Sequence, residues 1–197
     1  MKRWVIADTH WGHKKLIEEK LRPADYEARI FDRWTRLILA DDIVIHLGDV
    51  MLPDMDKGAW LLFQSLPGRK ILVRGNHDKR STSWYMERGF AFACDAFELG
   101  GILFTHEPRV NVPEYVNYNV HGHLHAGVHR EFESGPKHRL VSLEESGYAP
   151  VSVEKLVRQS RSPVTPSIDL LKGLHPADGY LELSADGFEL DSPTTEE

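Results

Sequence analysis

Short apolar runs alternate with longer amphipathic segments along the first half of the chain. Strand-like runs rich in valine, isoleucine and leucine lie at 4–7, 43–47 and 70–73. Between them, apolar residues recur at helical spacing over 26–38 and again over 56–66. Strands separated by helices indicate βαβ units and a largely parallel sheet, in which ligands collect at the carboxyl ends of the strands.

The second half of the chain predicts further strands and a last helix. Two runs at 90–99 and 102–105 flank Gly100 and Gly101, which is typical of a β-hairpin. The remaining expected elements are a short helix capped by Ser81, a loop over 109–119, a strand over 139–143 and a helix over 151–159.

A change of composition after residue 160 predicts a domain boundary. The segment 1–160 is expected to form one domain, because 197 residues suit one full core with or without a tail. Prolines punctuate 161–197, which is expected to be a C-terminal tail in which 180–190 forms a peripheral hairpin.

Composition and charge narrow the function classes. The 24 Lys and Arg against 30 Asp and Glu give a net charge of −6, which argues against a broad basic surface for duplex nucleic acid unless bound metals cancel it. The single cysteine, Cys94, rules out an internal disulfide and fits a reducing compartment. No apolar run approaches the roughly 20 residues that span a bilayer. We expect a cytoplasmic protein with no membrane contact and leave its oligomeric state open.

Residues that can bind metal ions follow each strand-like run. Together they are Asp8, His10, Asp49, Asn76, His106, His123 and His125. This mixed oxygen and nitrogen set suits Mn first, with Fe, Co, Ni and Zn as alternatives. Seven ligands exceed what one ion takes, but they serve two ions that share a carboxylate and hold a hydroxide between them. Because His123 and His125 alternate by two, we expect both rings on one side of an extended segment.

The turn after the third run adds acid–base chemistry. His77 is not needed as a ligand and can donate a proton, and Asp78 is expected to orient its ring. Arg74 and Arg109 flank this site, and His13 follows the first strand closely after Asp8 and His10. Arg74 and His13 are candidates for substrate phosphate binding. The alternatives are an ordinary ion pair for each arginine and a surface or helix-capping role for His13.

Five blocks in this order resemble the calcineurin-like metallophosphoesterases. They are Asp8-Thr9-His10, Gly48-Asp49, Gly75-Asn76-His77-Asp78, His106 and Gly122-His123-Leu124-His125. The resemblance covers roughly residues 4–157 and is nearest to small bacterial and phage members without a large cap domain.

The resemblance implies a fold and a ligand assignment. The fold is an α/β sandwich of two central sheets flanked by helices. One metal ion would be bound by Asp8, His10, Asp49 and His125, and the other by Asp49, Asn76, His106 and His123. Leu52 stands where many members have a second Asp, and the residues around Asp49 and Asp78 differ from those of protein Ser/Thr phosphatases.

The hypothesis is a dinuclear metal-dependent phosphoesterase in which a metal-bridging hydroxide attacks phosphorus and His77 protonates the leaving oxygen. A small phosphodiester such as a 2′,3′-cyclic nucleotide is the first expectation, with monoesters as further substrates. A nuclease or an enzyme acting on nucleic-acid ends is the alternative. A metal-binding scaffold without catalysis is the third possibility.

Overall fold

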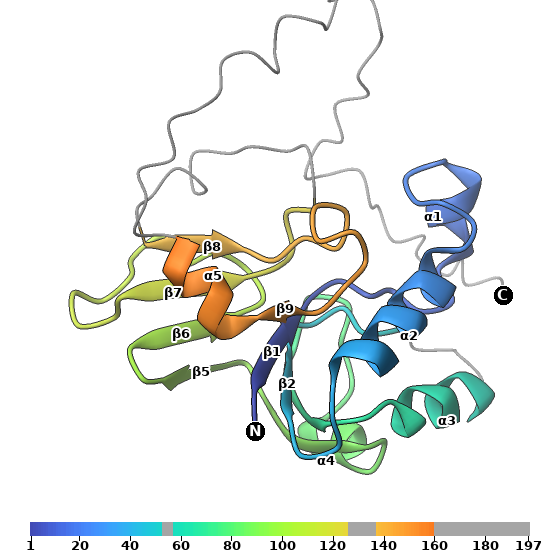
Figure 1. Ribbon diagram of the computed structural model, residues 1–197, viewed down its shortest axis with the longest axis horizontal. Helices are drawn as coiled ribbons and strands as arrows, with labels where there is room; N and C mark the ends of the chain where they lie inside the picture. Colours follow the sequence, from blue (N-terminus) through green and yellow to red (C-terminus); the bar gives the residue numbers. More distant parts are fainter. Residues whose placement is uncertain (53–56, 126–136, 160–197) are drawn as a thin grey trace, which may run out of the picture. The chain divides into compact units, whose positions relative to one another are not determined.

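The structure, a computed structural model, describes residues 1–52, 57–125 and 137–159. These residues form two β-sheets with helices packed on the first sheet (Figure 1). The expected α/β fold with two sheets is therefore confirmed. The predicted tail 161–197 and its hairpin lie outside the described residues, and the boundary at residue 160 stays a prediction.

The first sheet has five strands in the order β4-β3-β2-β1-β9. Four of them run parallel, so that Val5 lies opposite Ile45 and Ile45 opposite Ile71, and the pairing of β3 with β4 shifts register between Lys70 and Ile71. The carboxyl ends of these strands therefore meet at one edge of the sheet. Their bounds are β1 Arg3–Ile6, β2 Ile43–His46, β3 Arg69–Val73 and β4 Phe90–Cys94, with β9 Val151–Ser152 antiparallel to β1.

Helices cover the face of the first sheet that is turned away from the second sheet. In the longest helix, Tyr26, Ile30 and Trp34 recur every four residues and are buried, as its apolar spacing predicts. Ser81 caps a shorter helix by accepting from the backbone N–H of Trp84. No helix in the described ranges is long and apolar enough to cross a bilayer. The bounds of these helices are α1 Lys14–Glu18, α2 Tyr26–Leu37, α3 Lys57–Ser65 and α4 Thr82–Met86.

The second sheet has four strands in the order β5-β6-β7-β8. The hairpin at Gly100 and Gly101 is confirmed, but the strand expected over 90–99 is wrong, because Asp95 separates β4 in the first sheet from β5 in the second. The loop expected over 109–119 is shorter, since β7 begins at Tyr118. The strands are β5 Ala96–Leu99, β6 Ile102–Thr105, β7 Tyr118–His121 and β8 His138–Leu140.

A hydrophobic core holds the two sheets face to face. Val5, Ile45 and Val73 point from the first sheet toward Phe104 and Val120 of the second, and all five are buried. Each such side chain contributes about 1.5–3 kcal/mol on burial. Helix α5, Val153–Gln159, packs against the same core and contacts β1 and β9. This packing brings the loops after β6 and β7 to the edge where β1, β2 and β3 end.

Candidate metal centre

The loops at this edge adopt backbone conformations that most side chains avoid. The φ angles of Asp8, His10 and Asp49 are 52°, 44° and 54°, and those of His123 and His125 are 72° and 46°. Residues held in the left-handed region cluster at functional sites, where surrounding contacts stabilise the strain. Here the N–H of His10 donates to the Asp49 carbonyl at 2.9 Å. The extended segment expected for His123 and His125 is wrong, because both residues lie in this left-handed region.

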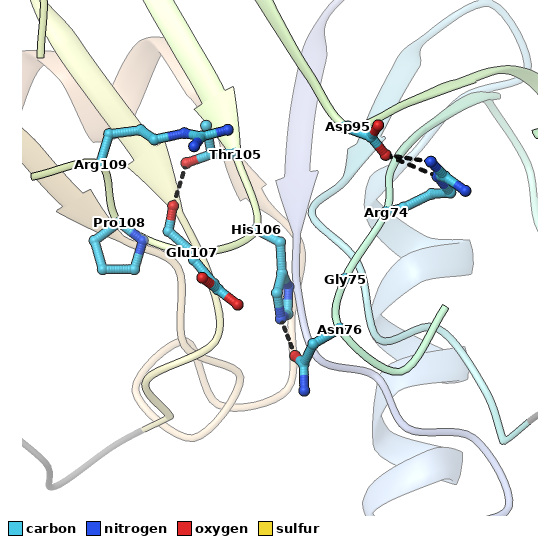
Figure 2. A pocket seen from close by; sticks show the side chains of 9 residues that line it. All are labelled: Arg74, Gly75, Asn76, Asp95, Thr105, His106, Glu107, Pro108 and Arg109. Carbon is cyan, nitrogen blue, oxygen red and sulfur yellow. Dashed lines mark hydrogen bonds and ion pairs between the residues drawn. The ribbon is translucent and has the colours of Figure 1, made fainter. Parts of the chain in front are cut away.

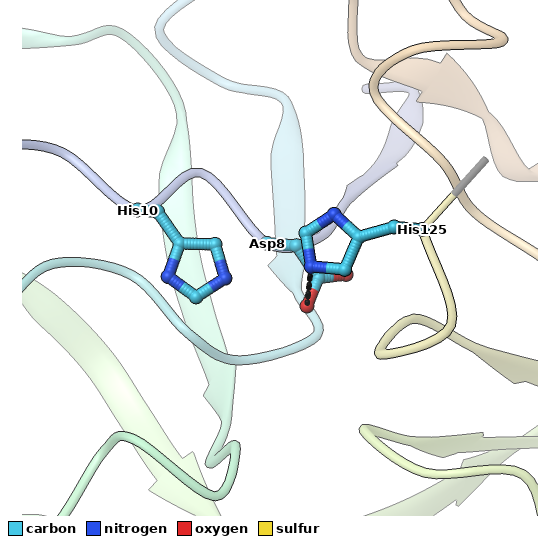
Figure 3. Close-up of side chains that lie close together, drawn as sticks. All are labelled: Asp8, His10 and His125. Atoms are coloured by element: carbon cyan, nitrogen blue, oxygen red, sulfur yellow. Dashed lines mark ion pairs between the residues drawn. The ribbon is translucent and has the colours of Figure 1, made fainter. Parts of the chain in front are cut away.

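Asp8, His10 and His125 form one group of converging donor atoms, which we call the first cation set (Figure 3). One donor atom from each lies within 4.8 Å of the others. The Nε2 atom of His125 faces Asp8 Oδ1 at 3.9 Å. That carboxylate oxygen is buried and has no hydrogen-bond partner among the described residues. An unpartnered buried carboxylate oxygen beside two imidazoles fits a cation, which would satisfy it.

Asn76, His106 and His123 form a second group, which we call the second cation set. The Nε2 atom of His106 lies 2.8 Å from Asn76 Oδ1, 3.1 Å from His123 Nδ1 and 3.5 Å from Asp49 Oδ2. Donor atoms bound to one ion at about 2.0–2.2 Å lie about 3–4 Å apart, so these spacings fit one ion.

The ring state of His106 also favours a cation at this point. Its Nδ1 lies 2.6 Å from the carbonyl oxygen of Leu47, which can only accept, so Nδ1 carries the hydrogen. In the neutral ring Nε2 then presents a lone pair to the amide oxygen of Asn76. Two lone pairs at this distance repel each other, and a positive charge between them removes the conflict.

Asp49 stands between the two cation sets. Its Oδ2 atom lies 3.5 Å from His106 Nε2 and 3.7 Å from His10 Nε2, and its Oδ1 accepts from the N–H of His77 at 2.9 Å. A Cβ atom on Gly75 would lie 2.1 Å from Oδ1, so glycine is required there for the carboxylate to fit. This placement suits a carboxylate shared by two ions.

Asp78 has a different role from the one expected. Its Oδ2 accepts from the N–H groups of Asp49 at 2.7 Å and Gly75 at 2.8 Å, and its Oδ1 from Val50 at 3.3 Å. The expectation that Asp78 orients the His77 ring is wrong, because its oxygens bind these backbone amides. Burial raises the pKa of Asp78 to about 6. This carboxyl ties the loop after β3 to the loop after β2.

His77 lies at the open side of the site. Its side chain is 44% exposed, its ring packs edge-on to His10 at 5.6 Å, and its Nε2 is 3.9 Å from Asp49 Oδ2. His13 packs edge-on to the same His10 ring at 5.7 Å, and burial lowers the pKa of His13. Both imidazoles therefore border the first cation set, where they can reach a bound substrate.

A pocket of about 230 Å³ opens beside the second cation set (Figure 2). Asn76 and His106 form part of its lining, so a substrate held at the second set would extend into it. Arg74 lies in the wall, but its Nε and Nη2 both donate to Asp95 Oδ1, at 2.9 and 2.5 Å. Arg109 lines the opposite wall and pairs with no carboxylate among the described residues.

Residues outside the five sequence blocks contact the loops that carry the ligand residues. His46 is fully buried, accepts from the N–H of Gly48 at 3.2 Å and lies 2.9 Å from Thr9 Oγ1. It thus joins the loops that carry Asp8 and Asp49. Sequence reasoning missed a partly buried contact between Arg22 and Glu144, 122 residues apart, which lies against His125. Arg22 is a single charged residue between two helices, and nothing in its sequence context predicts this contact.

A family model described as calcineurin-like phosphoesterase matches residues 1–183 of the chain. An uncharacterised protein of Methanocaldococcus jannaschii, MJ1445, is 30% identical over 168 residues, covering 80% of this chain and 90% of that protein. The gene 66 protein of Mycobacterium phage L5 is 36% identical over 132 residues, covering 60% of this chain and 58% of its own length.

Among solved structures, a protein of unknown function from Aquifex aeolicus, AQ665, has a similar fold. Its TM-score is 0.66 at 24% identity, and the match covers 80% of this chain and 98% of that one. At this identity the likeness supports the two-sheet fold alone.

Proposed function

This chain belongs to the calcineurin-like phosphoesterase family, and from that premise we propose that it hydrolyses small phosphodiesters with two divalent metal ions. The family match supports metal-dependent phosphoester hydrolysis. The observation that carries the finer proposal is the position of Asp49 Oδ2 between His10 and His106, one from each cation set.

The donor chemistry guides the choice of metal. Carboxylate, amide and imidazole donors without a thiolate suit Mn, with Fe, Co, Ni and Zn as alternatives. When bound, the two ions would supply an acidified water as nucleophile and neutralise charge on the phosphoryl oxygens. Asp8, His10 and His125 would hold one ion, Asn76, His106 and His123 the other, and Asp49 both.

His77 is the proposed general acid. It stands at the open side of the site, near both His10 and the shared carboxylate of Asp49. Its backbone N–H donates to Asp49 Oδ1, which fixes the start of the side chain relative to the shared carboxylate. An imidazole in this position can protonate the leaving oxygen.

The size and the lining of the pocket favour a small, polar substrate. Apart from Pro108 and Gly75, its lining consists of polar or charged residues. Because Asp95 accepts from Nε and Nη2 of Arg74 and the Arg80 carbonyl accepts from its Nη1, we assign the contact with a phosphate oxygen or a second anionic group to Arg109 rather than to Arg74. His13 would assist from the side of the first cation set.

Hydrolysis of bis-p-nitrophenyl phosphate and p-nitrophenyl phosphate with added Mn²⁺ tests the proposal. We expect faster diester than monoester turnover in the native protein and a loss of at least about 10³-fold in Asp49→Ala, since charge stabilisation at both ions is removed. Asp32→Asn, in an exposed pair with Arg36, is the matched control and should keep full turnover. Undiminished turnover in Asp49→Ala would refute the proposal.

A further inference from the structure

Arg22 lies buried in the connection between α1 and α2, with 3% of its surface exposed. Its Nη1 donates to the carbonyl oxygens of Asp8 at 2.8 Å and Thr9 at 3.4 Å. Its Nη2 lies 3.2 Å from Nδ1 of His125. One guanidinium therefore touches both loops that supply the first cation set.

Glu144 compensates the charge of this buried arginine. Its Oε1 accepts from Arg22 Nε at 2.8 Å, and its Oε2 accepts from Ser142 Oγ at 3.0 Å. The carboxylate is therefore charged and fixed in position.

Glu144 also faces the ring of His125. Its Oε1 lies 3.6 Å from Nδ1, the ring nitrogen that points away from Asp8. The other nitrogen, Nε2, faces Asp8 Oδ1 (Figure 3). A histidine that binds a cation through Nε2 must keep its lone pair there, so its one ring hydrogen lies on Nδ1 and needs an acceptor.

The two neighbours of His125 Nδ1 have opposite hydrogen-bonding roles. Arg22 can only donate, whereas Glu144 can only accept. When Nε2 keeps its lone pair, Glu144 is the one partner of the two that fits Nδ1. Arg22 then holds the carboxylate through Nε and the Asp8–Thr9 backbone through Nη1.

We propose that Glu144 and Arg22 are positioning residues of the first cation set: Glu144 accepts the Nδ1 hydrogen of His125, and Arg22 fixes this carboxylate against the loop of Asp8. The inference rests on the proposed metal site but not on any particular substrate. The second cation set needs no such pair, because the Leu47 carbonyl orients His106 directly.

The test is Mn²⁺ titration of the metal-free full chain, followed by electron paramagnetic resonance. In Glu144→Ala we expect the affinity for one of two ions to fall about 10–100-fold, as for other partners of metal-bound histidines, while the second ion binds unchanged. The spectrum at matched Mn²⁺ should change from a spin-coupled pair to a single-ion signal. Asp32→Asn is the surface control.

Glu144→Gln separates hydrogen-bond acceptance from charge pairing. Its amide oxygen still accepts from Nδ1, so we expect it to recover most of the affinity that Glu144→Ala loses. Equal losses in both variants would overturn the acceptor role. With diamagnetic Zn²⁺, the ¹⁵N spectrum of the His125 ring should show a hydrogen-bonded Nδ1–H in the native protein and not in Glu144→Ala.

Other outcomes of these experiments also support or contradict the proposal. If Glu144→Ala does not fold, Arg22→Met combined with Glu144→Ala leaves no unpaired buried charge, and the same loss is expected there. A native protein that binds no Mn²⁺ contradicts the metal site itself. A native protein that binds two ions, with unchanged binding in the variants, contradicts only the positioning role.

Discussion

The two cation sets share Asp49 but differ in their surroundings. Behind the first set lie a buried arginine and a carboxylate, Arg22 and Glu144. The second set adjoins the pocket, its Asn76 is exposed, and its His106 is oriented by a neutral backbone carbonyl. The comparison teaches that charged side chains support the first set, whereas the backbone supports the second set, which opens onto the pocket.

The two sets also differ in how easily a substitution can remove their supporting contacts. A backbone carbonyl at the end of β2 cannot be removed by substitution, so the second set keeps its support in any variant that folds. The first set depends on side chains that come from distant parts of the chain. Substitutions should therefore affect metal binding at the two sets to different extents.

The largest effect should come from Gly75→Ala, which acts on the carboxylate common to both sets. The new Cβ would lie 2.1 Å from Asp49 Oδ1 and 2.6 Å from its backbone nitrogen, so Asp49 must move. We expect loss of both ions and a fall in turnover of about 10³-fold. Metal analysis and diester hydrolysis measure this, with Asp32→Asn as control because its pair with Arg36 is exposed.

His77→Ala should have the next largest effect without removing either ion. General acid catalysis contributes about 10²-fold or more, and it matters most when the leaving group is a poor one. We expect alkyl esters to slow by at least about 10²-fold and p-nitrophenyl esters by less. Equal slowing across a leaving-group series would contradict the acid role.

Gly122→Ala should act chiefly on the first set, through Asp8. Its Cβ would lie 2.6 Å from Asp8 Oδ2 and 2.6 Å from the Cβ of Ala7. We expect a destabilisation of about 1–3 kcal/mol from overpacking, measured by urea unfolding, and the loss of one ion per chain. Retention of both ions would show that Asp8 tolerates the displacement.

The last effect concerns stability rather than catalysis and comes from His46, which links the loops of both sets. Burial lowers the pKa of His46 to about 3. Between about pH 6.5 and 3 the unfolded chain then binds one proton more than the folded chain, so the free energy of unfolding falls as pH falls, by up to about 1.4 kcal/mol per unit. Urea unfolding of the metal-free protein measures this slope, which His46→Gln should reduce; an unchanged slope would contradict a neutral His46.

Much of the fold and the choice of ligand residues can be predicted from sequence because both follow local patterns. β-Branched runs mark β1, β2 and β3, and the polar residues after each run necessarily lie at one edge of a parallel sheet. Asp8, His10, Asp49 and Asn76 lie there for that reason. His106, His123 and His125 follow strands of the second sheet and reach this edge through the packing of the two sheets. The proposal that they bind metal still depends on experiment.

The supporting contacts could not be predicted, because they join residues far apart in sequence. Arg22 and Glu144 have no motif, and Asp78 binds backbone amides that only the folded loops bring near it. The mostly apolar character of 90–99 conceals the crossing between sheets at Asp95. The left-handed backbone of His123 and His125 likewise depends on tertiary contacts.

The number of Mn²⁺ ions bound by the native chain, compared with that bound by Asp49→Ala, tests the shared centre most directly. Equilibrium dialysis should give two ions per native chain. Electron paramagnetic resonance should show that they are spin-coupled in the native protein, and should show no coupled pair in the variant. Binding of no ion or a single ion by the native chain, or a coupled pair that survives in Asp49→Ala, would contradict the account.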